Sequence, residues 1–385
     1  MDASLLQEIF EGRVRSLSAK GMGVVEHPSG IVVFVRGAFP NELVKVQITE
    51  VEKRYGFAKL LEVLEPSTER RPSPCPHHGL DLGHCSGCPW LPLNYKSQLE
   101  YKEHRLLHSL KRFNIDLSET KVLPIIPSDK ELGYRNRAQL KSDGKRVGFL
   151  SEGSKVLAPI EDCLAMTDKN RETLKAMIST LPNDAWKPSP RFLWSFLEID
   201  EWMNASEVKP NTRRPFFQGN SEQNLKMRQW LKERVQDLNK EQTVLELFSG
   251  SGNFTEVLSE SGFKRIVAVE VQGEGIKNLQ NKNLPGVETH GMDLFEKGVW
   301  WKVEKICPEA EILVMDPPRD GLVLRQGLFK GLKKLHTIVY ISCDVETYTR
   351  DVKDFVEHGF KLTELQALDQ FPQTPHVEIL SVLRR

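Results

Sequence analysis

The pattern of apolar and polar positions divides the chain into three parts, and the first predicts short strands. Residues 11–65 contain brief apolar runs such as GRVRSL, GMGVVEH and GIVVFVRG, separated by turn residues at PSG and GAFP. Runs of this length between glycine and proline are typical of a small all-β barrel. The proline-rich stretch EPSTERRPSPCP follows, so we expect the barrel domain to occupy residues 1–66.

The other two parts are predicted to be a mixed α+β segment and a doubly wound α/β domain. In residues 67–212 the stretch YKSQLEYKEHRLLHSLKRF has the apolar spacing of a helix, and AQLKSD, RVGFL and RFLWSFLEI are candidate strands. From residue 213 onward, helix SEQNLKMRQWLKERVQDL, strand TVLELF, a glycine turn, a helix and strand RIVAVEV alternate. Such alternation predicts a Rossmann-like parallel sheet over residues 213–385.

Composition and charge narrow the class of protein. With 39% hydrophobic residues, 28% charged residues and zero net charge, the chain is expected to be soluble and globular. No stretch approaches the roughly 20 apolar residues of a membrane helix, and MDASLLQEIFEGRVRS lacks the features of a secretory signal. We therefore expect a cytoplasmic protein, in which six cysteines indicate metal ligation or catalysis rather than disulfides.

A ligand pocket is predicted where the strands of the α/β domain end. TVLELFSGSGNF places Gly250 and Gly252 between a strand and a helix, where backbone amides can approach a ligand. Glu270 ends the next strand, about 20 residues later, and Asp293 and Asp316 follow further strands. Any one of these acids could be a solvated strand end, but three in succession favour a binding edge. The incomplete glycine fingerprint fits an adenosyl ligand without a pyrophosphate better than NAD.

One cysteine lies where a reactive group would be expected. IVYISCDVETYTRD places Cys343 at the end of an apolar strand, between the polar residues Ser342 and Asp344. A buried, inert thiol is the simpler interpretation. A nucleophile would need a proton handler, and TPHVEIL offers His376 and Glu378 beside the last strand. Glu378 could equally be an outward-facing strand residue.

Four other cysteines are spaced like metal ligands. CPHHGLDLGHCSGCPW and APIEDC supply Cys75, Cys85, Cys88 and Cys163. Four thiolates can hold zinc or an iron–sulfur cluster. Because histidines lie between the first two cysteines, a zinc site that includes histidine is the alternative. Cys307 has no partner in the sequence and is expected to be structural.

Several of these motifs together resemble a known family. DPPRDGL, ISCDVETYTRD and HVE, preceded by FFQ and LFSGSGNF, are similar to the S-adenosylmethionine-dependent RNA 5-methyluridine methyltransferases, over nearly the whole chain. The amino-terminal barrel resembles the TRAM domain of that family, an OB-like RNA-binding module. The glycine motif is common to many methyltransferases, whereas SC and HVE with a preceding DPPR are specific.

The resemblance implies roles for individual residues. It implies that Cys343 is the nucleophile that adds to uracil C6 and that Glu378 is the base that removes the C5 proton. The residues implied to contact S-adenosylmethionine are Gln218, Phe248, Asn253, Glu270, Asp293 and Asp316. It also implies a [4Fe–4S] cluster on Cys75, Cys85, Cys88 and Cys163. Nine residues separate Cys75 from Cys85, where the family pattern has five, but a longer loop adds little entropic cost.

The resemblance also implies the substrate class. The target base must leave its stack, so looped or single-stranded RNA is the expected substrate. The enzyme is expected to be a monomer. By analogy with the members that carry a cluster and a TRAM domain, we expect 23S ribosomal RNA, with transfer RNA as the alternative. A non-catalytic, metal-stabilised RNA-binding protein and an exocyclic-amine methyltransferase stay open, although an intact Cys343 and Glu378 argue against both.

Overall fold

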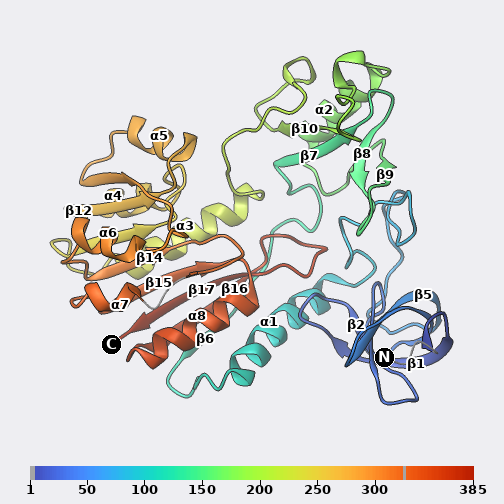
Figure 1. Ribbon diagram of the computed structural model, residues 1–385, viewed down its shortest axis with the longest axis horizontal. Helices are drawn as coiled ribbons and strands as arrows, with labels where there is room; N and C mark the ends of the chain where they lie inside the picture. The colour runs from blue at the N-terminus through green and yellow to red at the C-terminus, as the bar shows by residue number, and fades with distance from the viewer. Residues whose placement is uncertain (1–4, 324–326) are drawn as a thin grey trace. The chain divides into compact units, whose positions relative to one another are not determined.

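The computed structural model describes residues 5–323 and 327–385. Contacts group the chain into two compact units, each assembled from several segments (Figure 1). Unit 1 contains Met1–Tyr101, Lys130–Arg213 and Phe371–Pro375, and unit 2 contains Lys102–Asp129, Arg214–Gln370 and His376–Arg385. In the described ranges, no helix combines the length and the apolar character needed to cross a membrane.

Five strands of unit 1 close into the predicted barrel, in the order β1-β2-β3-β5-β4. They are β1 (Ile9–Leu17), β2 (Gly23–Glu26), β3 (Val32–Val35), β4 (Leu43–Val51) and β5 (Tyr55–Glu65). Because side chains alternate along a strand, Val44, Val46 and Ile48 of β4 fill the interior of the barrel. The prediction of a small amino-terminal β-barrel is therefore confirmed.

The rest of unit 1 is built around a four-stranded antiparallel sheet with the order β10-β7-β8-β9. Its elements are β7 (Arg137–Ser142), β8 (Val147–Leu150), β9 (Leu157–Pro159), α2 (Asp168–Ser179) and β10 (Ser195–Asp200). The candidate strand RFLWSFLEI was predicted too long. Its strand begins only at Ser195, since residues 191–193 are exposed and do not pair.

Unit 2 contains an eight-stranded sheet with the order β13-β12-β11-β14-β15-β17-β16-β6. Its strands are β6 (Lys121–Ile126), β11 (Thr243–Leu247), β12 (Arg265–Glu270), β13 (Val287–Gly291), β14 (Ile312–Met315), β15 (Thr337–Ser342), β16 (Lys361–Leu368) and β17 (Glu378–Arg384). Neighbouring strands are parallel, except that β17 runs antiparallel to both β15 and β16. The predicted α/β domain with a largely parallel sheet is thus confirmed.

Helices cover both faces of this sheet, as a doubly wound fold requires. They are α1 (Tyr95–Arg112), α3 (Ser221–Val235), α4 (Thr255–Glu260), α5 (Glu274–Asn281), α6 (Val299–Ile306), α7 (Leu328–Gly331) and α8 (Val345–Glu357). Alternate residues of one strand enter two cores: Leu313 packs with α1, α6, α7 and α8, whereas Val314 packs with α3 and α4.

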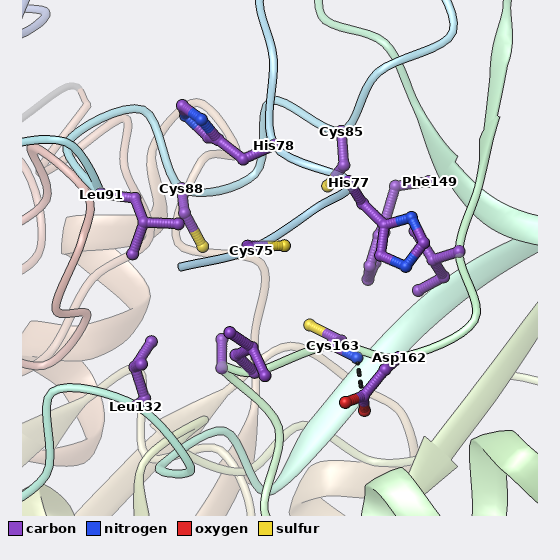
Figure 2. A pocket seen from close by; sticks show the side chains of 13 residues that line it. Cys75, His77, His78, Cys85, Cys88, Leu91, Leu132, Phe149, Asp162 and Cys163 are labelled. Atoms are coloured by element: carbon purple, nitrogen blue, oxygen red, sulfur yellow. Dashed lines mark hydrogen bonds between the residues drawn. The ribbon is translucent and has the colours of Figure 1, made fainter. Parts of the chain in front are cut away.

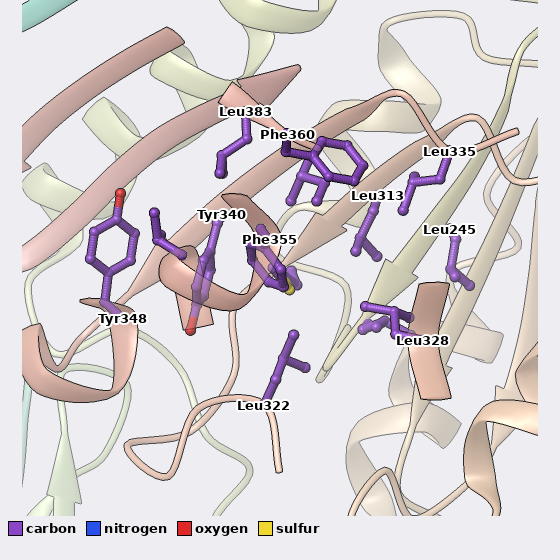
Figure 3. Packing of buried hydrophobic residues seen from close by; sticks show 14 of the residues in the cluster. Leu245, Leu313, Leu322, Leu328, Leu335, Tyr340, Tyr348, Phe355, Phe360 and Leu383 are labelled. Carbon is purple, nitrogen blue, oxygen red and sulfur yellow. The ribbon is translucent and has the colours of Figure 1, made fainter. Parts of the chain in front are cut away.

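The core on the α8 face is rich in aromatic residues around the strand that leads to Cys343. Figure 3 shows Tyr340 of β15 between Tyr348 and Phe355 of α8, with ring centroids 5.3 and 5.9 Å from that of Tyr340. The phenol of Tyr340 donates to Asp351 at 2.9 Å, which satisfies a buried hydroxyl. This packing fixes the end of β15, where the predicted site begins.

Candidate active site and cysteine cavity

Adjacent strands of unit 2 bring the predicted catalytic segments together. In the antiparallel pair β15 and β17, the register ends at Ser342 opposite Ile379, so Cys343 and Glu378 are the next residues along the chain at this end of the pair. Besides burial, the charge of Glu378 raises the pKa of Cys343, which indicates that the two side chains lie close together. In the parallel pair β14 and β15, Met315 lies beside Tyr340, so the DPPR segment runs next to Cys343. The nucleophile and the base predicted from sequence are therefore neighbours.

Glu378 points into the protein interior rather than outward. It is the first residue of β17 and is only 5% exposed. Burial raises the pKa of Glu378 to about 8, the negative charge of Asp316 contributes to the rise, and the positive charge of Arg319 opposes it. A carboxyl group with such a pKa can exchange a proton near neutral pH.

Cys343 lies in surroundings that favour the thiol over the thiolate. Its side chain is half-buried, at the junction between β15 and α8. Burial raises the pKa of Cys343 to about 12, the charges of Glu378 and Asp316 add to the rise, and Arg319 opposes it. The next residue, Asp344, caps α8 by accepting hydrogen bonds from the backbone of Glu346 and Thr347 at 3.1 and 3.0 Å.

The predicted glycine turn connects β11 to α4 in the conformation that its sequence requires. Phe248, Gly250 and Gly252 have φ angles of 61°, 54° and 92°, in the left-handed region that favours glycine. The carboxylate of Glu270 accepts a hydrogen bond from Gly250 N at 2.8 Å. This contact ties the turn to the end of β12, so the glycines and the first predicted acid form one edge.

The other residues expected to contact the cofactor lie around the same edge. Gln218 donates from Nε2 to Asp316 Oδ2 at 3.5 Å and accepts from Gln370 at 3.2 Å. Burial raises the pKa of Asp316 to about 7. Asn253 exchanges side-chain hydrogen bonds with Asn224 at 3.0 and 2.9 Å. Asp293 is exposed after β13, where it accepts from the backbone of Phe295 at 2.9 Å.

Sequence reasoning missed a further acid at this edge. Glu246 lies within β11 and is only 2% exposed, and its carboxyl group lies beside the side chain and backbone of Thr255. Burial raises the pKa of Glu246 to about 8. The charges of Asp316 and Glu270 add to this rise, which places Glu246 among the acids of the same edge. The available signal was a charged residue inside the otherwise apolar strand TVLEL.

The four cysteines of unit 1 line one cavity together with apolar side chains. Figure 2 shows the sulfur atoms of Cys75, Cys88 and Cys163 turned toward a common space, and Cys85 lines the same cavity. Burial and the neighbouring thiols raise the pKa of Cys88 to about 12. Backbone hydrogen bonds from His78 to Cys75 and from Cys85 to His77 close the long loop.

The four thiols of this cavity have the chemistry of ligands for a zinc or iron–sulfur centre, but their spacing is not that of a metal site. Within residues 5–323 and 327–385, no group of three or more His, Cys, Asp or Glu side chains is arranged to hold a metal ion. The histidines of the loop do not complete the set: His77 Nε2 accepts from Glu161 N at 3.2 Å, and the ring of His78 points away from the sulfurs (Figure 2). Cys307 is buried in the unit 2 core.

The chain is similar to known RNA methyltransferases over nearly its whole length. Residues 203–291 and 307–385 match the tRNA (uracil-5-)-methyltransferase family, and residues 10–61 match the TRAM domain. An uncharacterized RNA methyltransferase of Nitrosomonas europaea is 40% identical over 380 residues, which cover 98% of this chain and 97% of the relative. A 23S rRNA (uracil(1939)-C(5))-methyltransferase of Francisella tularensis subsp. novicida is 26% identical over 456 residues, covering 99% and 98%.

A solved structure shares the fold. The tRNA (uracil-54, C5)-methyltransferase of Pyrococcus abyssi, crystallised with S-adenosyl-L-homocysteine, superposes with a TM-score of 0.70 at 24% identity. The match covers 97% of this chain and 100% of that one.

Proposed function

This chain belongs to the tRNA (uracil-5-)-methyltransferase family and is an RNA uracil-C5 methyltransferase with a TRAM domain, and we propose that it works through a covalent bond between Cys343 and uracil C6. The observation that supports the proposal is that the β15–β17 register ends at Ser342 and Ile379, with Cys343 and Glu378 as the next residues at that end and Glu378 close enough to raise the pKa of Cys343. A nucleophile and a base on facing strands can act on the two adjacent carbons of one pyrimidine ring.

In the proposed reaction, the Cys343 thiolate donates an electron pair to C6, and the C5–C6 π pair moves toward C5 and O4. C5 then takes the methyl group that S-adenosylmethionine supplies, whose carbon–sulfur pair stays on the departing sulfur. Glu378 accepts the C5 proton, the C5–H pair restores the double bond, and the C6–S pair returns to Cys343. Covalent catalysis splits one difficult step into easier ones.

The environment of Glu378 supports its role as the base. General bases work best when their pKa lies close to the working pH, and burial raises the pKa of Glu378 to about 8. A carboxyl with an ordinary pKa near 4.5 would be a weaker acceptor for a proton on carbon.

S-adenosylmethionine is the cofactor of this family, and we propose that the edge formed by β11, β12, β13 and β14 binds it. The proposed contacts are Gln218, Phe248, Asn253, Glu270, Asp293 and Asp316, and we include Glu246 because it is buried beside Glu270 and Asp316. We also propose the functional division into residues 1–66, 67–212 and 213–385, acting as a cytoplasmic monomer.

We propose a looped or single-stranded uridine of 23S ribosomal RNA as the substrate. The near full-length similarity to the Francisella enzyme, which is named for 23S rRNA, supports this choice. Transfer RNA is the second candidate, because the Pyrococcus enzyme that shares the fold is named for tRNA. Methylation of total RNA from cells that lack this enzyme, followed by mapping of the labelled nucleotide, separates the two.

We further propose that Cys75, Cys85, Cys88 and Cys163 hold a [4Fe–4S] cluster, which would cross-link the long loop to the central segment. Convergence of four thiols on a cavity with apolar walls supports a cluster over a histidine-containing zinc site. Protein purified without oxygen should contain iron and sulfide and little zinc. Cys163→Ser should lower the iron content, whereas the matched control Cys307→Ser should not. Zinc in place of iron would contradict the proposal.

The covalent mechanism is tested by blocking release of the adduct. Glu378→Gln should accumulate a protein–RNA adduct that survives a denaturing gel, because the C5 proton can no longer be removed. The adduct should need both S-adenosylmethionine and Cys343. Full turnover by Cys343→Ala, or no adduct with Glu378→Gln under conditions where the wild type methylates RNA, would count against the assignment.

A further inference from the structure

Arg319 and His376 meet across the end of the strand that carries Cys343. The sheet order is β14-β15-β17, so β15 lies between the strands that lead to these two residues. Arg319 follows β14 and His376 precedes β17, yet Arg319 Nη2 lies 3.5 Å from His376 Nε2. Their side chains therefore bridge the end of β15, and Cys343 is the first residue beyond it.

The site below this bridge needs a positive charge. Reaction requires a thiolate on Cys343, which would lie next to the carboxyl groups of Glu378 and Asp316. Like charges in a half-buried site repel each other and oppose ionisation. The charged or titratable groups that face the site from the packed elements are Lys102 and Arg105 of α1, Asp316 and Arg319 after β14, Asp344 and Glu346 at α8, and His376 and Glu378 at β17.

Among the cations of that set, Arg319 is the one whose field acts on both reacting groups. It opposes the rise in pKa of Cys343 and of Glu378. Lys102 instead forms a fully buried ion pair with Asp369, and the charge of Arg105 is opposed by Asp344 and Glu346. Within the described part of the chain, Arg319 makes no ion pair with an acid, so its charge is available to the site.

His376 is suited to hold Arg319 in place. Burial lowers the pKa of His376 to about 4, and the nearby charges of Arg319, Lys102 and Arg105 contribute. A neutral imidazole keeps one ring nitrogen as an acceptor. Arg319 is otherwise exposed, so without His376 its long side chain would sample many rotamers.

We propose that Arg319 is the electrostatic partner of the Cys343 thiolate, and that His376 is the positioning residue that orients it. This inference rests on the proposed role of Cys343 as nucleophile. The thiol proton passes to water, the negative charge on sulfur faces the guanidinium, and the thiolate pair then attacks C6. When bound RNA excludes water from the site, the attraction between guanidinium and thiolate strengthens.

Alkylation of Cys343 in the absence of RNA and cofactor isolates the effect of Arg319. The rate of reaction with iodoacetamide is measured against pH on the tryptic peptide of residues 335–350, which contains Cys343 and no other cysteine. Arg319→Gln should react about two- to fivefold more slowly near pH 8, the effect of an exposed charge partner, with its profile moved to higher pH. Arg319→Lys should keep most of the rate, and His376→Asn should fall between.

The matched control removes an arginine from the other end of the same strand pair. Arg384 lies opposite Thr337, where β15 begins, so Arg384→Gln should leave the alkylation profile unchanged. Binding of S-adenosylhomocysteine by each variant, measured by calorimetry, confirms a folded unit 2. If Arg319→Gln is misfolded, His376→Asn decides instead: slower alkylation with the profile moved to higher pH supports the inference, and a wild-type profile overturns the positioning role of His376.

A second measurement separates failure of this inference from failure of the proposed function. Adduct formation with RNA in the Glu378→Gln background should drop more on adding Arg319→Gln than alkylation does, because RNA excludes water from the site. An Arg319→Gln variant that alkylates with the wild-type profile would overturn the inference and leave the covalent mechanism standing. If Glu378→Gln forms no adduct at all, the proposed function fails whatever alkylation shows.

Discussion

Glu378 is a carboxyl group held in the interior of unit 2, and its replacement by glutamine is expected to raise stability while blocking catalysis. Burial raises the pKa of Glu378 from an ordinary value of 4.5 to about 8. Because the folded-state pKa lies above the unfolded-state pKa, the folded state binds this proton more tightly. The corresponding stability is fully present below pH 4.5 and is lost as the pH rises to about 8.

The size of the effect follows from the width of this window. One pKa unit corresponds to about 1.36 kcal/mol, so the raised pKa of Glu378 lowers the stability of unit 2, relative to its value at low pH, by about 3 kcal/mol at pH 7 and about 4 kcal/mol at pH 8. Glutamine carries no charge at either pH and avoids this cost. The buried amide of glutamine needs hydrogen-bond partners, and this requirement reduces the gain in stability by about 1 kcal/mol. At about 2–4 °C per kcal/mol, the melting temperature should rise by roughly 10 °C at pH 8.

Calorimetric melting of the wild type and Glu378→Gln at pH 5 and pH 8 measures this effect. The variant should melt well above the wild type at pH 8 and close to it at pH 5, where Glu378 is protonated in the folded state. Glu260→Gln, an exposed acid at the end of α4, is the matched control and should show no such dependence. An equal difference at both pH values, or a variant that melts below the wild type at pH 8, would refute the reasoning.

Three further outcomes are expected. Cys343→Ala should abolish methyl transfer to RNA and leave binding of S-adenosylhomocysteine nearly intact by calorimetry. Lys102→Met should destabilise unit 2 by about 3–5 kcal/mol in denaturant unfolding, because Asp369 becomes a buried, unpaired charge; adding Asp369→Leu should recover much of the loss. Gly252→Ala should cost about 1–3 kcal/mol and weaken cofactor binding, since its φ is 92° and its Cβ would lie 2.6 Å from Leu279.

Much of the fold could be predicted because the informative patterns are local. The short alternating runs before residue 66 became the strands of a closed barrel, and the alternation after residue 213 became the parallel core of the unit 2 sheet. A strand that is buried on both faces shows a continuous apolar run, as IVYIS does in β15. The end of such a run indicates where the strand reaches the edge of the sheet, even when the neighbouring strands are not known.

What could not be predicted depends on pairings between distant residues. The strand β6 at residues 121–126 lies in the part expected to form the central segment, but it pairs with β16 at the edge of the unit 2 sheet. Likewise, the segment Phe371–Pro375 leaves unit 2 to pack in unit 1, where Gln98 donates to Gln373 at 2.8 Å. The local spacing of apolar residues does not carry this information, because these pairings depend on contacts between segments more than 200 residues apart.

The direction of β17 explains why the sequence alone could not decide whether Glu378 faces the site or faces outward. In a parallel sheet, ligand-binding residues follow the carboxyl ends of strands, and Glu378 begins its strand instead. Because β17 is antiparallel to β15, its amino end lies at the edge where β15 ends. His376 and Glu378, which precede and begin a strand, therefore reach the same edge as Cys343 and Arg319, which follow strands. The antiparallel direction of β17 therefore explains how a residue at the start of a strand can serve the proposed site at the carboxyl end of β15.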